Sequence, residues 1–185
     1  MINLTHKDLW RLLNACEENQ YNFRDIIAFY VIENHDNNII ERMVLPPIST
    51  SEGLIIIGLN RKTNGTCVLL HPEKHTCLLY DSRPIACRNY PFSFTVSSEK
   101  SSIPTVSFVE GSRSNCKGLL SKEISLDDQE LIDEGRRTLK DIERFKDICH
   151  EIQLESERTD LLSINEILSI LILVGENESK ISSDC

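Results

Sequence analysis

Cysteine is the residue type whose number and spacing in this chain could support chemistry. The 185-residue sequence contains seven cysteines, at positions 16, 67, 77, 87, 116, 149 and 185. Because the number is odd, they cannot all pair in intramolecular disulfides. Four of them, separated by 9, 9 and 28 residues, form the candidate ligand set: Cys67, Cys77, Cys87 and Cys116. Four thiolates suit a tetrahedral zinc ion and an iron–sulfur cluster equally well.

The segment between the first two of these cysteines predicts a β-hairpin. Residues 68–70 and 78–80 are apolar arms, and the polar run 72–76 is the turn, so Cys67 and Cys77 can come together. His71 and His75 are alternative ligands, but Pro72 and the turn between them argue against a shared helical face. We expect both histidines to be exposed. They could serve as the base for a cysteine nucleophile, but no nucleophile elbow or protease motif accompanies them.

Cys87 is predicted to lie on a short helix. Asp81 or Ser82 can cap this helix, and the fixed φ of Pro84 suits its first turn. The positive end of the helix dipole would then favour the thiolate form of the cysteine. Two arginines, Arg83 and Arg88, either offset the negative charge of a thiolate-rich site or are ordinary surface charges.

Charge and hydropathy exclude several classes of protein. The net charge is -9, which argues against nucleic acid as a partner. The acidic excess lies in residues 119–185, whereas residues 67–118, which contain the four cysteines, are the one segment with a positive balance. The first residues show no signal peptide, and no apolar run approaches the roughly 20 residues that span a bilayer. We therefore expect a cytoplasmic protein with no membrane association, whose clustered cysteines stay reduced.

The pattern of apolar residues predicts an α+β fold. Thr5 and Asp8 resemble a capping box at the start of an amphipathic helix. A second helix is predicted from Phe23 to Val31, followed by strands over residues 39–45 and 53–59.

The last third of the chain is predicted to be helical. One helix is capped by Ser125 with Asp128, and a second by Ser163 with Glu166, with Gly175 as a left-handed stop. The second helix is apolar over much of its circumference, so it packs against the body of the protein, which we favour, or against a protein partner. Residues 1–120 would form a cysteine-cluster domain, and residues 121–185 an acidic helical extension.

The other three cysteines are expected to be structural. Cys16 and Cys149 fit the apolar faces of their helices, where cysteine behaves as a small buried hydrophobe. Cys185 is the terminal residue and is expected to be frayed.

The cysteine segment resembles a known family. Residues 77–92 read CLLYDSRPIACRNYPF, which is similar to the C-x-I-Y-x-x-R-P-x-x-C-R-x-Y-P-F signature of the YkgJ-type cysteine-cluster family. The preceding CVLL (67–70) and the later SNCKG (114–118) resemble two further elements of that family. The resemblance implies a zinc- or iron-chelating domain that binds metal through its cysteines, and it favours an iron–sulfur cluster over zinc. A related group includes flagellin lysine methylases.

The family also has a compact N-terminal cysteine group of the C-x2-C-C kind, which this sequence lacks. Residues 4–9, LTHKDL, resemble the segment that follows that group. The resemblance therefore leads us to expect that the natural protein begins upstream of Met1.

Three functions remain open from the sequence. The first is a metal-binding protein with a four-cysteine site. The second is a cluster-dependent enzyme, such as a protein methyltransferase or an oxidoreductase, although no Gly-rich nucleotide fingerprint is present. The third is an interaction module with a structural zinc site, whose C-terminal helices bind a partner.

Overall fold

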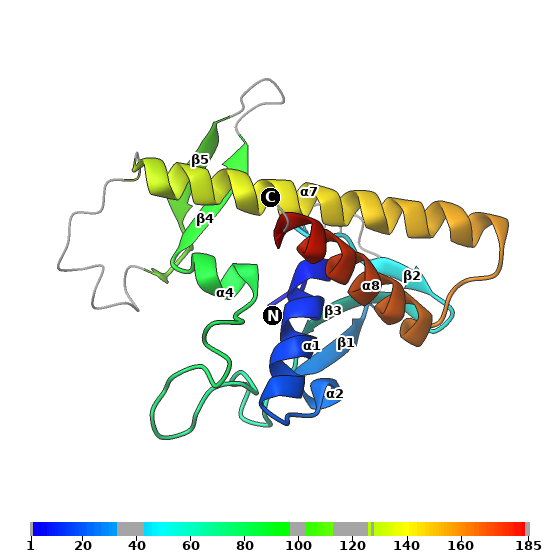
Figure 1. Ribbon diagram of the computed structural model, residues 1–185, viewed down its shortest axis with the longest axis horizontal. Helices are drawn as coiled ribbons and strands as arrows, with labels where there is room; N and C mark the ends of the chain where they lie inside the picture. The colour runs from blue at the N-terminus through cyan, green and yellow to red at the C-terminus, as the bar shows by residue number, and fades with distance from the viewer. Residues whose placement is uncertain (1, 33–42, 97–102, 113–125, 127, 184–185) are drawn as a thin grey trace.

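The computed structural model describes residues 2–32, 43–96, 103–112, 126 and 128–183, and shows the predicted α+β fold. The described residues form two small antiparallel sheets and three helices of more than ten residues, α1, α7 and α8, whose arrangement is drawn in Figure 1. The described elements are α1 (His6–Glu18), α2 (Phe23–Ile26), β1 (Ile27–Val31), β2 (Ile48–Thr50), β3 (Gly53–Leu59), α4 (Ile85–Asn89), β4 (Phe92–Val96), β5 (Pro104–Phe108), α7 (Gln129–Arg158) and α8 (Ile164–Ser183).

The first sheet has the order β1-β3-β2 and is antiparallel throughout. Its central strand, β3, matches the predicted strand at residues 53–59. The N-terminal segment lies along β3 beyond the end of β2, because the Leu4 amide donates to the carbonyl of Ile57 and the Leu59 amide donates to the carbonyl of Ile2. These hydrogen bonds place the residues before α1 next to the sheet.

The predicted second helix is wrong beyond its first turn. Only Phe23–Ile26 is helical, and Ile27–Val31 forms β1, which pairs with β3 along its whole length. The β-branched and aromatic residues of β1 suit a strand, and pairing with the apolar β3 outweighs their helical spacing. The strand predicted over residues 39–45 falls partly outside the described residues, and residues 43–45 are not in a strand. The strand in this region is instead β2, which follows the two prolines at 46 and 47.

The second sheet, β4 with β5, was not predicted. Each strand has five residues, and Phe92 pairs with Phe108 at one end of the ladder. The long helix α7 contacts both of these strands and also β2, so it bridges the two sheets, as Figure 1 shows. Its N-cap is Asp128, whose side chain accepts from the Glu130 amide, so α7 begins three residues later than a capping box of Ser125 with Asp128 would place it. Ser125, the other residue of the predicted capping pair, lies outside the described residues.

The C-terminal helix α8 packs against α1 in the body of the protein, as we favoured. Its buried side chains, Ile167, Leu168 and Leu171, belong to the same hydrophobic core as the buried residues of α1, β3 and α7. The predicted capping box is present, with the Ser163 amide donating to Glu166 at 2.8 Å. Because one core includes residues from both sides of position 120, the division into two domains stays a prediction.

A buried histidine joins these helices. His6 Nε2 of α1 lies 3.0 Å from an oxygen of Glu178 in α8, and the second oxygen of Glu178 accepts from Arg144 in α7 at 2.8 Å. Burial lowers the pKa of His6, so the imidazole is held largely neutral against the stacked ring of Phe145.

Gly175 does not end a helix, contrary to the prediction. It lies inside α8, where a Cβ atom would come within 2.5 Å of the His6 carbonyl oxygen and 2.9 Å of the Trp10 Cβ. The glycine is therefore required for the close approach of α8 to α1.

Replacing Gly175 with alanine is expected to lower the free energy of unfolding by about 1–3 kcal/mol, because backbone atoms of α1 must move to admit the Cβ. Alanine has a higher intrinsic helix propensity than glycine, so a loss of stability in this variant can be attributed to the steric clash. The measurement is urea unfolding. Asn177→Ala, at an exposed position of the same helix, is the matched control and should be neutral or slightly stabilising. A more stable Gly175→Ala protein would contradict the packing described.

None of the described helices is both long and apolar enough to cross a lipid bilayer. Part of α8 still presents apolar side chains to solvent, with Leu173 and Ile181 more than half exposed. A protein partner for the C-terminal helices stays a prediction.

Candidate metal centre

Three of the four candidate ligands line one cavity. Cys67, Cys77 and Cys87 are half-buried around a space of about 290 Å³. Most of the remaining wall is apolar, and Arg83 is the charged side chain among its described lining residues. The fourth candidate, Cys116, lies outside the described residues. The structure thus places three cysteines, ten residues apart in the chain, around one cavity.

Cys67 and Cys77 are positioned by a looped segment rather than by the predicted hairpin strands. Residues 68–70 and 78–80 are turns and isolated bridges, in which Cys67 pairs with Arg61, and Leu70 with Cys77. The segment is anchored because the side chains of Leu69 and Leu79 insert into the core, with 1% and 4% of their surface exposed. The buried side chains of Leu69 and Leu79 therefore hold Cys67 and Cys77 in place, as the backbone hydrogen bonds of a regular hairpin would have done.

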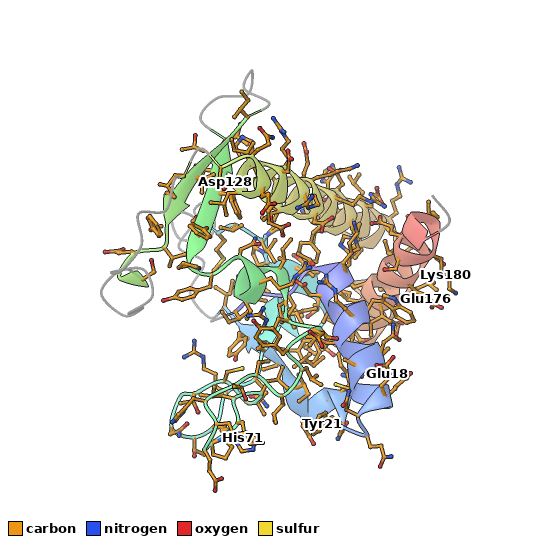
Figure 2. All side chains as sticks on the ribbon, turned by 60° about the vertical axis from the view of Figure 1, so that its left-hand side comes forward. Glu18, Tyr21, His71, Asp128, Glu176 and Lys180 are labelled. Carbon is orange, nitrogen blue, oxygen red and sulfur yellow. The ribbon has the colours of Figure 1, made fainter. Side chains whose placement is uncertain are left out.

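The two histidines of this segment lie at its outer end, away from the cavity. His71 is labelled there in Figure 2, and its Nδ1 atom accepts from the amides of Glu73 and Lys74 at 3.2 Å each. His75 is exposed and has a positive φ of 53°. Neither histidine lines the cavity within the part of the chain that the structure describes. The ring of His71 therefore stabilises the turn, and the amide of His75 donates to the His71 carbonyl.

Cys87 lies on α4, and the start of this helix differs from the prediction. The N-cap is Pro84, without a side-chain hydrogen bond, so neither Asp81 nor Ser82 caps the helix. Instead, the Ile85 amide donates to Asp8 Oδ1 in α1 at 2.9 Å, across 77 positions of sequence. A local capping pattern could not reveal this partner, because Asp8 already has a role in the capping box of α1.

Asp8 of α1 has a role near the site that the sequence did not reveal. Its side chain is fully buried, and its second oxygen accepts from the Thr5 amide at 3.1 Å, while Arg11 lies 3.3 Å from the first. Burial raises the pKa of this carboxyl group, and Arg11 and the two backbone amides oppose that rise. Asp8 therefore connects α1 to the helix that carries Cys87.

The expected thiolate at Cys87 is wrong for the protein without metal. Burial raises the pKa of Cys87 to about 11, with smaller contributions from Cys67, Cys77 and Asp8. Burial also raises the pKa of Cys77. The first turn of a five-residue helix is too weak a dipole to offset this desolvation.

The two arginines differ in their relation to the cavity. Arg83 lines it and opposes the rise in pKa of Cys77 and Cys87, and its guanidinium lies 3.7 Å from the centre of the Tyr80 ring. Arg88 is exposed and acts electrostatically on Arg11 rather than on the cysteines. Arg83 is therefore placed to offset negative charge on the cysteines, whereas Arg88 is an ordinary surface charge.

The chemistry of the donor set fits zinc or an iron–sulfur cluster, because three cysteine sulfurs share a mostly apolar cavity. The side chains of these cysteines are, however, not yet close enough together to form a metal site. Among the described residues, no group of three His, Cys, Asp or Glu side chains is close enough together to hold a metal ion. Metal binding would require the cysteine segments to draw together.

Two other cysteines are structural, as predicted. Cys16 and Cys149 are buried in the hydrophobic core, with 1% and 7% of their surface exposed. Burial raises the pKa of Cys149 to about 12, so this thiol is inert. Cys185 lies outside the described residues.

Comparison with known proteins agrees with the cysteine pattern. The CxxCxxCC family, described as "Putative zinc- or iron-chelating domain", matches residues 14–150, which is well over half of the chain and includes all four candidate ligands. No curated protein and no solved structure shows significant similarity to this sequence. By its sequence, the chain belongs to the CxxCxxCC family of zinc- or iron-chelating domains.

Proposed function

We propose that Cys67, Cys77, Cys87 and Cys116 bind an iron–sulfur cluster, in preference to zinc. The observation that carries the proposal is the single cavity lined by the first three cysteines. Cys116 completes the conventional set of four thiolates, and its place in the proposal comes from the family resemblance and the spacing.

The wall of the cavity supports this proposal. Apolar neighbours such as Ile2, Leu59 and Leu69 limit the access of water, and Arg83 supplies a positive charge next to the sulfurs. Solvent exposure and nearby charge are among the properties by which proteins set cluster potentials. When bound, a cluster would supply electron-transfer or structural chemistry. The residues of this chain would hold it, shield it and offset part of its negative charge.

Binding is expected to be coupled to local ordering. The thiols must lose their protons to act as ligands, and burial keeps those of Cys77 and Cys87 protonated in the metal-free protein. The looped segment that carries Cys67 and Cys77 has few regular backbone pairings, so it can adjust as the ligands converge. Metal binding would thereby stabilise this part of the fold.

Anaerobic purification followed by metal and sulfide analysis tests the proposal. We expect brown protein that contains iron and acid-labile sulfide in equal amounts, with visible charge-transfer absorption that reduction bleaches. A colourless protein with stoichiometric zinc would overturn the preference for a cluster and favour a structural site. A protein that retains neither metal after reconstitution would overturn the metal-binding function itself.

A further inference from the structure

The chain segment around the cysteine cavity is positively charged, although the chain as a whole is acidic. Residues 60–90, which include the three cysteines, contain five basic and two acidic residues, whereas the whole chain has a net charge of -9. In Figure 1 the looped part of this segment, between β3 and α4, projects from the body of the protein. The positive charge is therefore concentrated on an accessible part of the molecule.

Three of these cations lie next to the cavity itself. Arg83 lines it. Arg61 pairs with Cys67 in an isolated bridge, and both residues line a smaller neighbouring cavity. The Nζ atom of Lys62 donates at 2.6 Å to the carbonyl oxygen of Leu70, which lines the cysteine cavity. Two separate stretches of chain thus place positive charge around the same space.

Carboxylates of the described residues do not neutralise these three cations. Every ion pair between described residues joins groups of α1, α7 and α8. The three side chains instead donate to backbone carbonyl oxygens, those of Gly65, Leu70 and Tyr80. The acidic residues of the segment, Glu73 and Asp81, are exposed. A carbonyl oxygen orients a cation without cancelling its charge, so the charge stays available for a partner.

Two exposed aromatic side chains lie among these cations. Tyr90 lines the cysteine cavity and is 49% exposed. Tyr80 is 57% exposed, and the centre of its ring lies 3.7 Å from the guanidinium carbon of Arg83. Tyrosine and arginine are enriched where proteins bind one another, because each combines apolar surface with hydrogen-bond donors. This composition favours a polypeptide over a free inorganic anion as the partner.

We propose that this surface binds a partner protein through an acidic polypeptide segment. We call it the cationic rim, and its residues are Arg61, Lys62, Tyr80, Arg83 and Tyr90. Carboxylates of the partner would face the three cations, and its aliphatic carbons would pack on the two rings. Opposite charges on the two surfaces would speed the encounter and exclude basic proteins.

The overall charge of the chain favours a protein over nucleic acid at the rim. An extended polyanion would continue past the rim and meet the acidic remainder of the chain, whereas an acidic segment on a folded partner can contact the rim alone. The proposal goes beyond metal binding and does not rest on it, because the rim consists of side chains that are charged or aromatic whether or not the cysteines hold a metal.

Titration of the full-length protein with three labelled probes of matched length tests the proposal. The probes are an oligoglutamate peptide, an oligolysine peptide and a thymidine oligonucleotide, each with an uncharged dye whose fluorescence anisotropy reports binding. We expect oligoglutamate to bind, and to bind at least about fivefold more weakly at high salt than at low salt. The other two probes should bind at least about tenfold more weakly than oligoglutamate. Absence of oligoglutamate binding, or tighter binding of the oligonucleotide, would overturn the proposal.

Charge reversal localises the binding. Arg61→Glu and Arg83→Glu should each weaken oligoglutamate binding at least about tenfold. Lys140→Glu, at an exposed position of α7, changes the net charge equally and is the matched control, with an expected loss of less than about twofold. Arg61 is exposed and its side chain bonds only to the Gly65 carbonyl, so its variant should keep the fold, which circular dichroism verifies. Equal losses in all three variants would mean that net charge alone governs binding, and would overturn the rim.

The same titration on the protein as purified and after chelation separates this proposal from the metal site. Both samples should bind oligoglutamate, and the chelated protein at least as tightly, because thiolate ligands add negative charge next to Arg83. Binding that is confined to the metal-loaded protein would overturn the proposal. A second copy of the chain, through its acidic helices, is the competing occupant. Sedimentation at low salt should show a monomer, and a dimer that Arg61→Glu abolishes would assign the rim to self-association instead.

Discussion

Replacing Cys87 with serine is expected to reduce the metal content of the purified protein to below about a tenth of the wild-type value. Cys87 lies on a helix whose first amide donates to the buried side chain of Asp8, and burial raises its pKa to about 11. A serine hydroxyl is close in shape to the thiol but is not deprotonated at neutral pH, so it cannot replace a thiolate ligand. Cys67→Ser and Cys77→Ser should have the same effect, because each removes one sulfur from the same cavity.

The controls come from within the chain. Cys149→Ala removes a thiol that is buried in the core and has a pKa of about 12, and it should leave the metal content unchanged even though it lowers stability. Cys16→Ala serves in the same way. Cys116→Ser tests the fourth ligand. Full metal content in all of the serine variants would show that the shared cavity is not the metal site.

A second measurement separates ligand loss from unfolding. Metal that binds only the folded state raises its melting temperature, so a chelator should lower the melting temperature of the wild type. In Cys87→Ser the chelator should have no effect, because there is no metal to remove. A variant that is merely unfolded would instead show no cooperative thermal transition.

The sequence predicted those elements whose causes are local. The capping boxes at Thr5 and Ser163 each depend on side chains three residues from the amides they bind. The strand β3 is a β-branched apolar run bounded by turn residues, so its composition identified it. Cys67, Cys77 and Cys87 line one cavity, although the hairpin strands predicted to bring the first two together are absent.

The sequence could not predict features that depend on distant partners. Residues 27–31 have helical spacing and strand composition alike, and pairing with β3 decides between them. The need for a glycine at position 175 is explained by the close approach of α1, which is remote in sequence.

Asp8→Ala is expected to lower the free energy of unfolding by about 3–5 kcal/mol, the largest stability effect predicted for this protein. The substitution leaves two buried amides, those of Thr5 and Ile85, without their acceptor. It also leaves Arg11 without the carboxylate that lies 3.3 Å from it. Urea unfolding of the metal-free protein measures the loss without any contribution from ligand binding.

Two variants resolve the causes of this loss. Asp8→Asn keeps one carbonyl oxygen as an acceptor but removes the charge, so it should lose less stability than alanine does. Glu166→Ala removes the equivalent acid of the capping box of α8, which is exposed and therefore able to exchange its hydrogen bonds for water. Its effect should be much smaller. Equal losses for Asp8→Ala and Glu166→Ala would mean that the bond between α1 and α4 contributes little.

Asp8→Ala should also weaken metal binding, although the carboxylate is not among the residues that line the cysteine cavity. The Ile85 amide is the first of α4, and its bond to Asp8 fixes where that helix begins relative to α1. Without this bond, the start of the helix that carries Cys87 has no side-chain cap. Metal affinity measured by competition with a chelator, under conditions where the variant is folded, should therefore fall in Asp8→Ala and be partly recovered in Asp8→Asn. Unchanged affinity in a folded Asp8→Ala protein would show that Asp8 stabilises the fold without positioning Cys87.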